Sequence, residues 1–215
     1  ETKDLDDALT AALGMVVETI HAQTGTFWFY ERSGDGRIHP RAVYGGADMS
    51  DICLLPGEGI AGQVIEDGQS VIITDCQADP RWAGRVDEKT GFRTDSMICV
   101  PLSMEEGTFG SIQIINKTDR ILFDEKDLWF TECLAEEVAR VLAEKGFLAE
   151  GGWTESAEIT ADKITFRELF CEGTEKDMLD CLEMFDEIDE LPDRKRREAI
   201  RLCRQLRVVL SSRRR

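Results

Sequence analysis

The sequence predicts an α+β fold in which a mostly antiparallel sheet carries terminal helices on one face and a ligand loop on the other. Three short apolar or β-branched runs, each bounded by turn residues, are typical of buried strands; they are residues 71–73, 97–100 and 112–115. Residues 4–23 and 124–147 repeat apolar side chains every three or four positions, as amphipathic helices do. The polar loop 74–95 is long for a compact domain, which favours use as a lid or binding segment.

The N-terminal part reads as a helix followed by a hairpin. Helix 4–23 has its apolar stripe at Leu5, Leu9, Ala12, Val16 and Ile20, and Gly25 is expected to end it. Strands 26–31 and 38–44 flank a polar, glycine-containing turn at residues 33–36. A further short strand is expected at residues 52–55, just before the Pro-Gly pair at 56–57.

Residues 59–67 are predicted to form a short helix whose first turn holds small residues. Ala61 and Gly62 allow a close approach of the backbone to a neighbour or to a ligand. The amide-rich start of this helix suits an anion, whereas tight packing on the sheet explains the same residues and is the favoured interpretation. Residue spacing alone leaves both readings open.

The loop 74–95 is rich in carboxylates and hydroxyls. Such acids are usually a solvated face, and a metal site would need them to converge, which spacing does not show. The same residues suit hydrogen bonds to a purine or a ribose. Trp82 fits either a lid aromatic or a surface anchor of the loop.

The last predicted helix of this part begins beside a lysine and an aspartate. Lys117 ends a strand, Asp124 is a good N-cap, and Asp127 lies in the first helical turn, where the helix dipole favours a carboxylate. Helix 124–147 also carries Phe130 and Cys133 outside its main apolar stripe. Surplus apolar surface of this kind predicts a homodimer.

Gly151 and Gly152 mark a boundary, so residues 1–148 are expected to form one domain and residues 149–215 a linker with a C-terminal helical hairpin. Residues 172–193 hold ten acids and one base, and residues 194–215 hold ten bases and one acid. Opposite charges on two amphipathic helices favour pairing with each other. The alternative is a basic tail that binds nucleic acid or lipid.

Charge and composition exclude several classes of function. A net charge of −17 repels phosphate over most of the surface, so neither nucleic acid nor an anionic membrane is an expected partner. No apolar run approaches the ~20 residues of a membrane span. Seven scattered cysteines with no CxxC pair favour a reducing, cytoplasmic location. Two histidines, no phosphate-binding loop and no dinucleotide fingerprint predict no catalytic centre, no cofactor and no metal.

Five motifs occur in order between residues 57 and 127. They are GEGIAGQV at 57–64, the Asp-Pro at 79–80, VDEKTGFRT at 86–94, ICVPL at 98–102, and Asn116-Lys117 followed by Phe123 and Asp127. Together they resemble the GAF domains of cyclic-nucleotide phosphodiesterases and bacterial adenylate cyclases. The resemblance covers residues 1–148 more loosely and does not extend to residues 149–215.

This resemblance implies a regulatory module that binds cAMP or cGMP and signals through its terminal helices, which in such proteins commonly form a dimer. The ligand-binding positions that it implies are Thr26, Tyr44, Ile60, Ala61, Asp87, Thr90, Thr94 and Gln113. The amides of Ile60 and Ala61 would face the cyclic phosphate, and Asp87 would accept from the base or ribose. Lys117 and Asp127 would pair and brace the pocket without touching the ligand.

The sequence departs from the family at Tyr44, where an acid can read the base, at Ala83, where an aromatic can close on the ligand, and at Leu128, where a glutamate is usual. The choice between cAMP and cGMP therefore stays open. Two alternatives remain: a ligand-free GAF scaffold for dimerisation, and a GAF-type methionine sulfoxide reductase that uses loop cysteines. Residues 149–215 would provide the contact surface for a downstream protein partner.

Overall fold

The computed structural model describes residues 2–32, 34–46, 48–105, 107–118, 122–144, 146–149 and 152–153. The helical hairpin expected within the C-terminal segment lies outside these residues. The role expected for that segment therefore stays a prediction. The main elements, in chain order, are α1 (Thr2–Thr19), β1 (Ala22–Tyr30), β2 (Ile38–Tyr44), α2 (Gly59–Asp67), β3 (Val71–Ile73), α3 (Arg85–Thr90), β4 (Met97–Met104), β5 (Gly107–Lys117) and α4 (Glu125–Glu144). Two-residue strands β6 (Leu148–Ala149) and β7 (Gly152–Trp153) pair with each other.

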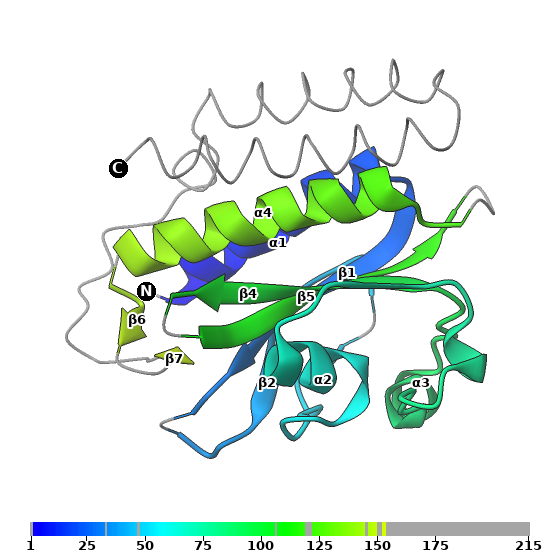
Figure 1. Ribbon diagram of the computed structural model, residues 1–215, viewed down its shortest axis with the longest axis horizontal. Coiled ribbons are helices and arrows are strands. Elements are labelled where there is room, and N and C mark those ends of the chain that lie inside the picture. Colours follow the sequence, from blue (N-terminus) through cyan, green and yellow to red (C-terminus); the bar gives the residue numbers. More distant parts are fainter. Residues whose placement is uncertain are drawn as a thin grey trace. The chain divides into compact units, whose positions relative to one another are not determined.

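The sheet has five strands in the order β2-β1-β5-β4-β3, and every neighbouring pair is antiparallel. Helices α1 and α4 cover one face, while α2, α3 and the loops around them lie on the other (Figure 1). This arrangement confirms the predicted α+β fold with its antiparallel sheet.

Strand β1 supplies the core on both sides of the sheet. Phe27, Trp28 and Phe29 are all almost completely buried, which explains why the run of aromatic residues shows no polar alternation. Successive side chains of a strand point to opposite faces. Phe27 and Phe29 therefore face α1 and α4, whereas Trp28 packs with Ile60 and Met97 on the α2 side.

Gly25 does not end the first helix, in contrast to the prediction. Helix α1 ends at Thr19, and the chain turns through His21, which has a φ of 53°. Gly25 lies within β1, where an added Cβ would be 2.9 Å from Leu13 Cδ1 and 3.0 Å from Val17 Cγ2. The glycine is needed because α1 packs closely on the strand.

Two other loops differ from their predictions. Residues 52–55 do not form a strand; Ile38 and Leu54 make a single isolated antiparallel bridge. The long polar loop contains α3 and a short 3₁₀ helix at Cys76–Ala78, whose N-cap Asp75 accepts a hydrogen bond from the amide of Ala78. Local side-chain capping thus gives this loop structure that hydrophobic periodicity does not reveal.

Asn116 ties the end of that loop to the sheet. Its backbone has a φ of 55°, in the left-handed region that asparagine tolerates better than most residues. Its side-chain Oδ1 accepts from the amides of Asp95 (2.8 Å) and Ser96 (3.0 Å). Its Nδ2 donates to the carbonyl of Arg93 (2.7 Å) and to Gln23 Oε1 (3.1 Å). One buried amide therefore joins three segments.

Lys117 and Asp127 form a mostly buried ion pair next to Asn116. Lys117 Nζ lies 2.9 Å from Asp127 Oδ2, and the two side chains are only 11% and 9% exposed. The lysine also lies over the Phe123 ring. Asp127 accepts from the amide of Asp124, and Asp124 accepts from the amide of Asp127, so the two residues form a reciprocal cap. Pairing and capping are thus both present.

Replacing Asp127 with asparagine would remove the charge and leave the Lys117 ammonium mostly buried without its partner. Breaking a buried pair on one side costs about 3–5 kcal/mol. We expect the Asp127→Asn variant of the full chain to lose about 3 kcal/mol of unfolding free energy at pH 7, measured by urea titration. Unchanged stability would show that the pair does not brace the fold.

The double variant Lys117→Met/Asp127→Asn should recover most of this loss because no charge remains buried. Burial raises the pKa of Asp127 above its ordinary value, although Lys117 and the Asp124 amide favour the charged form. Burying the ionised carboxylate therefore costs free energy that offsets part of what the ion pair contributes. The double variant buries neither charge, so its unfolding free energy should lie close to that of the unmodified chain.

Candidate functional site

A cavity lies between the sheet and the α2–α3 side of the molecule. Its volume is about 650 Å³ when the space open to solvent is included. Its walls come from β1, β5, the start of β4, the first turn of α2 and the segment from Trp82 to Thr94. Most of the lining is apolar and includes Trp28, Ile60, Trp82, Phe92, Met97 and Ile115.

Six of the eight predicted ligand-binding residues line this cavity. They are Thr26, Ile60, Ala61, Thr90, Thr94 and Gln113. The structure brings them together from β1, α2, β5 and the α3 loop. Their contact with a ligand stays a prediction.

Tyr44 lies elsewhere and needs a correction. It pairs across the sheet with Gly25, so both residues face the same side, towards α1. A Cβ added at Gly14 of α1 would be 2.7 Å from the Tyr44 ring, and the Tyr44 hydroxyl donates to Glu18. That hydrogen bond, with some burial, raises the pKa of Tyr44. Tyr44 therefore belongs to the packing of α1.

Asp87 is also placed differently from its prediction. It does not line the cavity; its two carboxylate oxygens accept from the amide and the hydroxyl of Thr94, both at 2.8 Å. Asp87 thus closes the loop that follows α3. The Thr90 hydroxyl is likewise used locally, since it donates to the Val86 carbonyl at 2.8 Å.

Two hydrogen-bond donors in the cavity wall, the Thr26 hydroxyl and Gln113 Nε2, have only weak internal acceptors. The Thr26 hydroxyl is 3.8 Å from Met49 Sδ, and Gln113 Nε2 is 3.6 Å from Met97 Sδ. A thioether is a weak acceptor, so both donors would gain from a ligand oxygen or nitrogen. Thr26 and Gln113 are direct cross-strand partners on β1 and β5 and are both buried.

The first turn of α2 supplies backbone donors to the same space. Gly59, Ile60 and Ala61 line the cavity, and the first amides of a helix have no partner within it. The N-cap residue Glu58 makes no side-chain cap to them, because it accepts from the Leu55 amide instead. Neither lysine nor arginine is among the lining residues of this described cavity. An anion here would depend on helix amides and the helix dipole.

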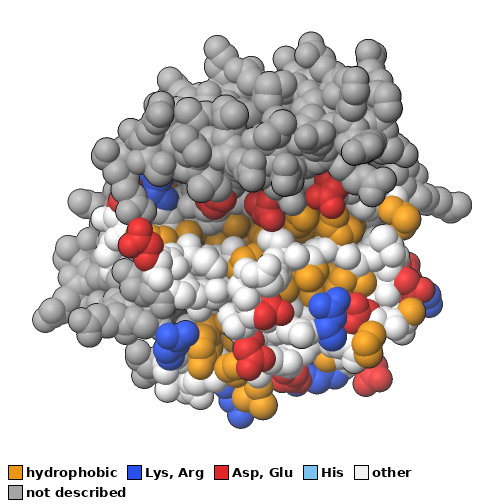
Figure 2. Space-filling model, viewed as in Figure 1, with side chains coloured by type: hydrophobic (Ala, Val, Ile, Leu, Met, Phe, Trp, Pro, Cys, Tyr) orange, Lys and Arg blue, Asp and Glu red, His pale blue; other side chains and the backbone are white. Residues whose placement is uncertain are grey.

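Basic side chains fasten α3 to the segment before α2. Arg85 lies 2.7 Å from Glu58 and also donates to the Cys53 carbonyl. Lys89 donates to the Asp51 carbonyl at 2.7 Å. On the visible face, basic and acidic side chains are interspersed over the α2 and α3 side (Figure 2). The charges of this region therefore hold the loop in place.

Acids of the loop do not converge on one point. Asp75 caps the 3₁₀ helix, Asp79 pairs with Arg81 at 2.7 Å, and Asp95 pairs with Arg93 at 2.7 Å. Within the described residues, metal-ligating side chains gather at the β1–β2 hairpin instead.

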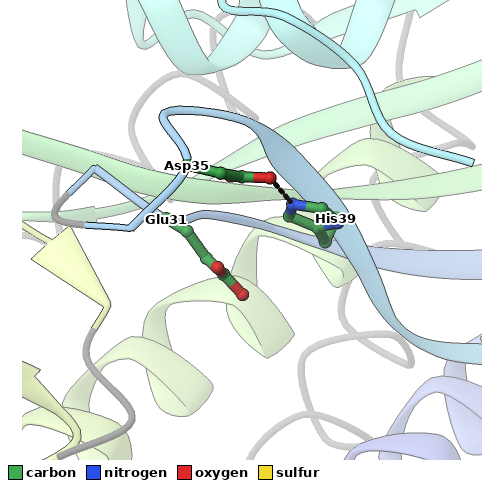
Figure 3. Close-up of side chains that lie close together, drawn as sticks. All are labelled: Glu31, Asp35 and His39. Atoms are coloured by element: carbon green, nitrogen blue, oxygen red, sulfur yellow. Dashed lines mark hydrogen bonds and ion pairs between the residues drawn. The ribbon is translucent and has the colours of Figure 1, made fainter.

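That hairpin group consists of Glu31, Asp35 and His39, whose ligand atoms lie within 4.8 Å of one another (Figure 3). Their regular spacing of four residues is the signal that sequence analysis missed. Asp35 and His39 bond each other at 3.0 Å, and none of the three lines the cavity. Exposed groups of this kind are common without a metal, so we assign no ion to them.

The cysteines near the cavity are poorly suited to redox chemistry. Burial raises the pKa of the Cys76 thiol to about 12, helped by nearby carboxylates, and burial raises that of Cys99 to about 12 as well. The thiolate is the reactive form of cysteine. Neither thiol has the low pKa that a nucleophile needs.

Comparison with known proteins agrees with this geometry. The chain is 38% identical over 84 residues to a cGMP-specific 3′,5′-cyclic phosphodiesterase of Drosophila pseudoobscura pseudoobscura, covering 38% of this chain and 8% of that protein. It is 40% identical over 92 residues to the dual 3′,5′-cyclic-AMP and -GMP phosphodiesterase 11 of Drosophila melanogaster, covering 42% of this chain and 6% of that protein. The chain thus spans less than a tenth of the length of these relatives.

Solved structures support the fold. The GAF domain of a Coxiella burnetii phosphoenolpyruvate-protein phosphotransferase superposes with a TM-score of 0.58 at 20% identity, over 65% of this chain and 83% of that one. A type II free methionine-R-sulfoxide reductase of Thermoplasma acidophilum gives 0.55 at 19% identity, over 66% and 95%. At such identities the likeness shows the fold alone.

Among the described residues, no helix is both long and apolar enough to cross a membrane.

The matched family is a regulatory domain rather than a catalytic one. Its model, described as GAF domain, matches residues 2–143. Most of the residues that the structure describes lie within that match, and the chain belongs to the GAF domain family.

Proposed function

We propose that this GAF domain binds a cyclic nucleotide, cAMP or cGMP, in the cavity between the sheet and α2–α3. The observation that carries the proposal is that unpaired helix amides and weakly paired sheet donors face one largely apolar cavity. A cyclic nucleotide has the matching parts: a phosphate with one negative charge, a polar ribose, and a flat aromatic base with polar edges. Phosphodiesterase relatives whose names specify cGMP, or cAMP and cGMP, support this class of ligand.

The proposed orientation places the cyclic phosphate at the start of α2. Helix N-termini favour anions, and Ile60 and Ala61 carry amides of the first turn. The base then lies among the apolar side chains, with Trp82 and Phe92 available for stacking. Thr26 and Gln113 face the remaining polar edge from the sheet.

We propose that the signal passes through the loop and β5 to α4. Asn116 holds residues 93–96 of the loop, and the next residue, Lys117, pairs with Asp127 in the first turn of α4. A ligand that orders the loop therefore acts on Asn116, whose neighbour Lys117 is paired with the first turn of α4. In this way binding changes the terminal helices without any catalytic step.

The assembly proposed is a cytoplasmic homodimer formed by α1 and α4, with residues 149–215 contacting a downstream protein. Phe130 was expected to project outside the apolar stripe of α4, but it is buried, so it does not supply exposed dimer surface. Of the two α4 residues expected to add dimer surface, the partly exposed Cys133 still supports the proposal. The described cysteines are free thiols, which fits a reducing compartment.

One observation favours a second function, a GAF scaffold that binds no small molecule. Thr90, Thr94 and Asp87 satisfy one another and the local backbone without a ligand. A reductase role has less support, because the buried thiols of Cys76 and Cys99 have raised pKa values.

Calorimetry of the full chain with cAMP and cGMP tests the proposal directly. Thr26→Val keeps the side-chain shape and removes the hydroxyl that faces the cavity. The loss of one neutral hydrogen bond, about 0.5–1.5 kcal/mol, should weaken binding about three- to tenfold. Thr108→Val, on β5 outside the cavity, serves as the matched control and should keep the original affinity. Absence of binding by either nucleotide would favour the scaffold.

Thr94→Ala should weaken nucleotide binding by a different route. It removes the hydroxyl that donates to Asp87, so the loop after α3 loses one of its two bonds to that carboxylate. We expect faster amide hydrogen exchange in residues 85–95 together with weaker binding, about tenfold for a bond to a charged group. Unchanged exchange and affinity would remove Thr94 from both the loop closure and the site.

Light scattering on the full chain tests the dimer. We expect a mass twice that of the 24.2 kDa chain at tens of micromolar. Cys133 is partly exposed on α4, so Cys133→Arg adds a charge to the helix surface at little cost to the core. Val138 is completely buried, so Val138→Ala would disturb the core and is not used as a probe. The Cys133→Arg variant should shift the mass towards monomer. A monomeric parent chain would contradict the proposed assembly.

A further inference from the structure

The orientation of one buried amide in the cavity wall is fixed by its partner. Trp28 Nε1 donates to Gln113 Oε1 at 2.8 Å, and the two residues are 1% and 8% exposed. An indole N–H is only ever a donor, so its partner must be the amide oxygen rather than the amide nitrogen. The Trp28 indole therefore determines which end of the Gln113 amide is available to the rest of the cavity.

Gln113 Nε2 is left on the side of Met97. Its contact to Met97 Sδ is 3.6 Å long, and a thioether is a weak acceptor. The amide nitrogen carries two N–H groups, and no stronger acceptor among the described residues receives them. Trp28, Met97 and Gln113 all line the cavity. This wall of the cavity accordingly presents a hydrogen-bond donor.

We propose that Trp28 positions Gln113 as a fixed donor that selects a purine with an acceptor at C6, so that the cavity prefers cGMP to cAMP. This inference rests on the proposed function, since it concerns the specificity of the same site. Gln113 is the specificity-determining residue, and Trp28 is a positioning residue that acts through it.

The two purines differ at the atom that such a donor would read. Guanine presents acceptors at both O6 and N7, whereas adenine presents an amino donor at N6 beside N7. An unconstrained glutamine pairs well with adenine because its oxygen accepts from N6 while its nitrogen donates to N7. Here the oxygen is already engaged by Trp28. Guanine would present its O6 acceptor to the remaining N–H donor of Gln113. Adenine would instead present its N6 amino donor to that donor.

The phosphate does not compete for this donor in the proposed orientation. The helix start at Ile60 and Ala61 is the part of the cavity with unpaired backbone amides and a favourable dipole. The wall around Gln113 belongs to the sheet, where Thr26 is its cross-strand neighbour. Thr26 adapts to either base because a hydroxyl both donates and accepts. Discrimination therefore falls to Gln113.

Titration calorimetry of the full chain with cGMP, cAMP and cyclic IMP tests the inference. Hypoxanthine shares O6 and N7 with guanine but lacks the 2-amino group. We expect cGMP and cyclic IMP to bind about tenfold or more tightly than cAMP, as a donor left unsatisfied by the wrong base implies. If cyclic IMP bound as weakly as cAMP, the 2-amino group would be the feature read, and the inference would be overturned.

Trp28→Phe removes the indole N–H and keeps an aromatic ring, which frees the Gln113 amide to turn over. The ratio of cAMP to cGMP dissociation constants should then fall towards one, chiefly because cAMP binds more tightly. Trp129→Phe is the matched control: it removes an indole from buried α4 outside the cavity and should leave the ratio unchanged. Gln113→Leu, which removes the amide altogether, should also abolish the preference if Trp28→Phe does not fold.

The outcomes separate this inference from the function on which it rests. A ratio that survives both Trp28→Phe and Gln113→Leu would overturn the inference and leave cyclic-nucleotide binding intact, as would equal binding of cGMP and cAMP by the unmodified chain. Binding of none of the three nucleotides to folded protein would overturn both. A preference for cGMP and cyclic IMP that is lost in the two variants and kept in Trp129→Phe supports it.

Discussion

The hydrogen bonds of the Asn116 side chain are the interactions on which the cavity side of the structure depends. Its four hydrogen bonds join β1, the end of the long loop and the end of β5 in one buried point. Few residues combine a left-handed backbone with an amide that both donates and accepts. Aspartate would lose both donated bonds, and glycine would lose all four. The cavity has a defined wall because residues 93–96 cannot leave the sheet without breaking this set.

The cavity therefore combines a rigid side with an adaptable one. The sheet side is fixed by ladder hydrogen bonds and by the Trp28–Gln113 contact. The α3 side is held by surface charges such as Arg85–Glu58, and exposed pairs of this kind contribute little individually. Under the proposed function, α3 would move to admit a ligand while the sheet keeps its shape. The sheet would then recognise the base, and the loop would respond to binding.

Much of this arrangement was predictable, and the errors have physical causes. The apolar strand runs and the helix periodicity were enough to predict the α+β fold, because both patterns follow from which side chains are buried. Gly25 was misread because a glycine that ends a helix and a glycine that admits one look alike in sequence. Tyr44 was misplaced because the face of a strand residue depends on register, which its partner Gly25 sets. Asp87 was read as a ligand group because sequence does not show that Thr94 folds back onto both of its oxygens.

Strand β1 gives the two faces of the domain a direct mechanical connection. Thr26 and Trp28 line the cavity, while the alternate residues of the strand, Gly25 and Phe27, pack towards α1 on the opposite face. Under the proposed function, a small shift of the strand on binding would press on the Leu13 contact, where Gly25 leaves no spare room. Close-packed interiors transmit such displacements because they have few voids to absorb them. Together with the Asn116–Lys117–Asp127 connection to α4, this contact would give a bound ligand a path to each terminal helix.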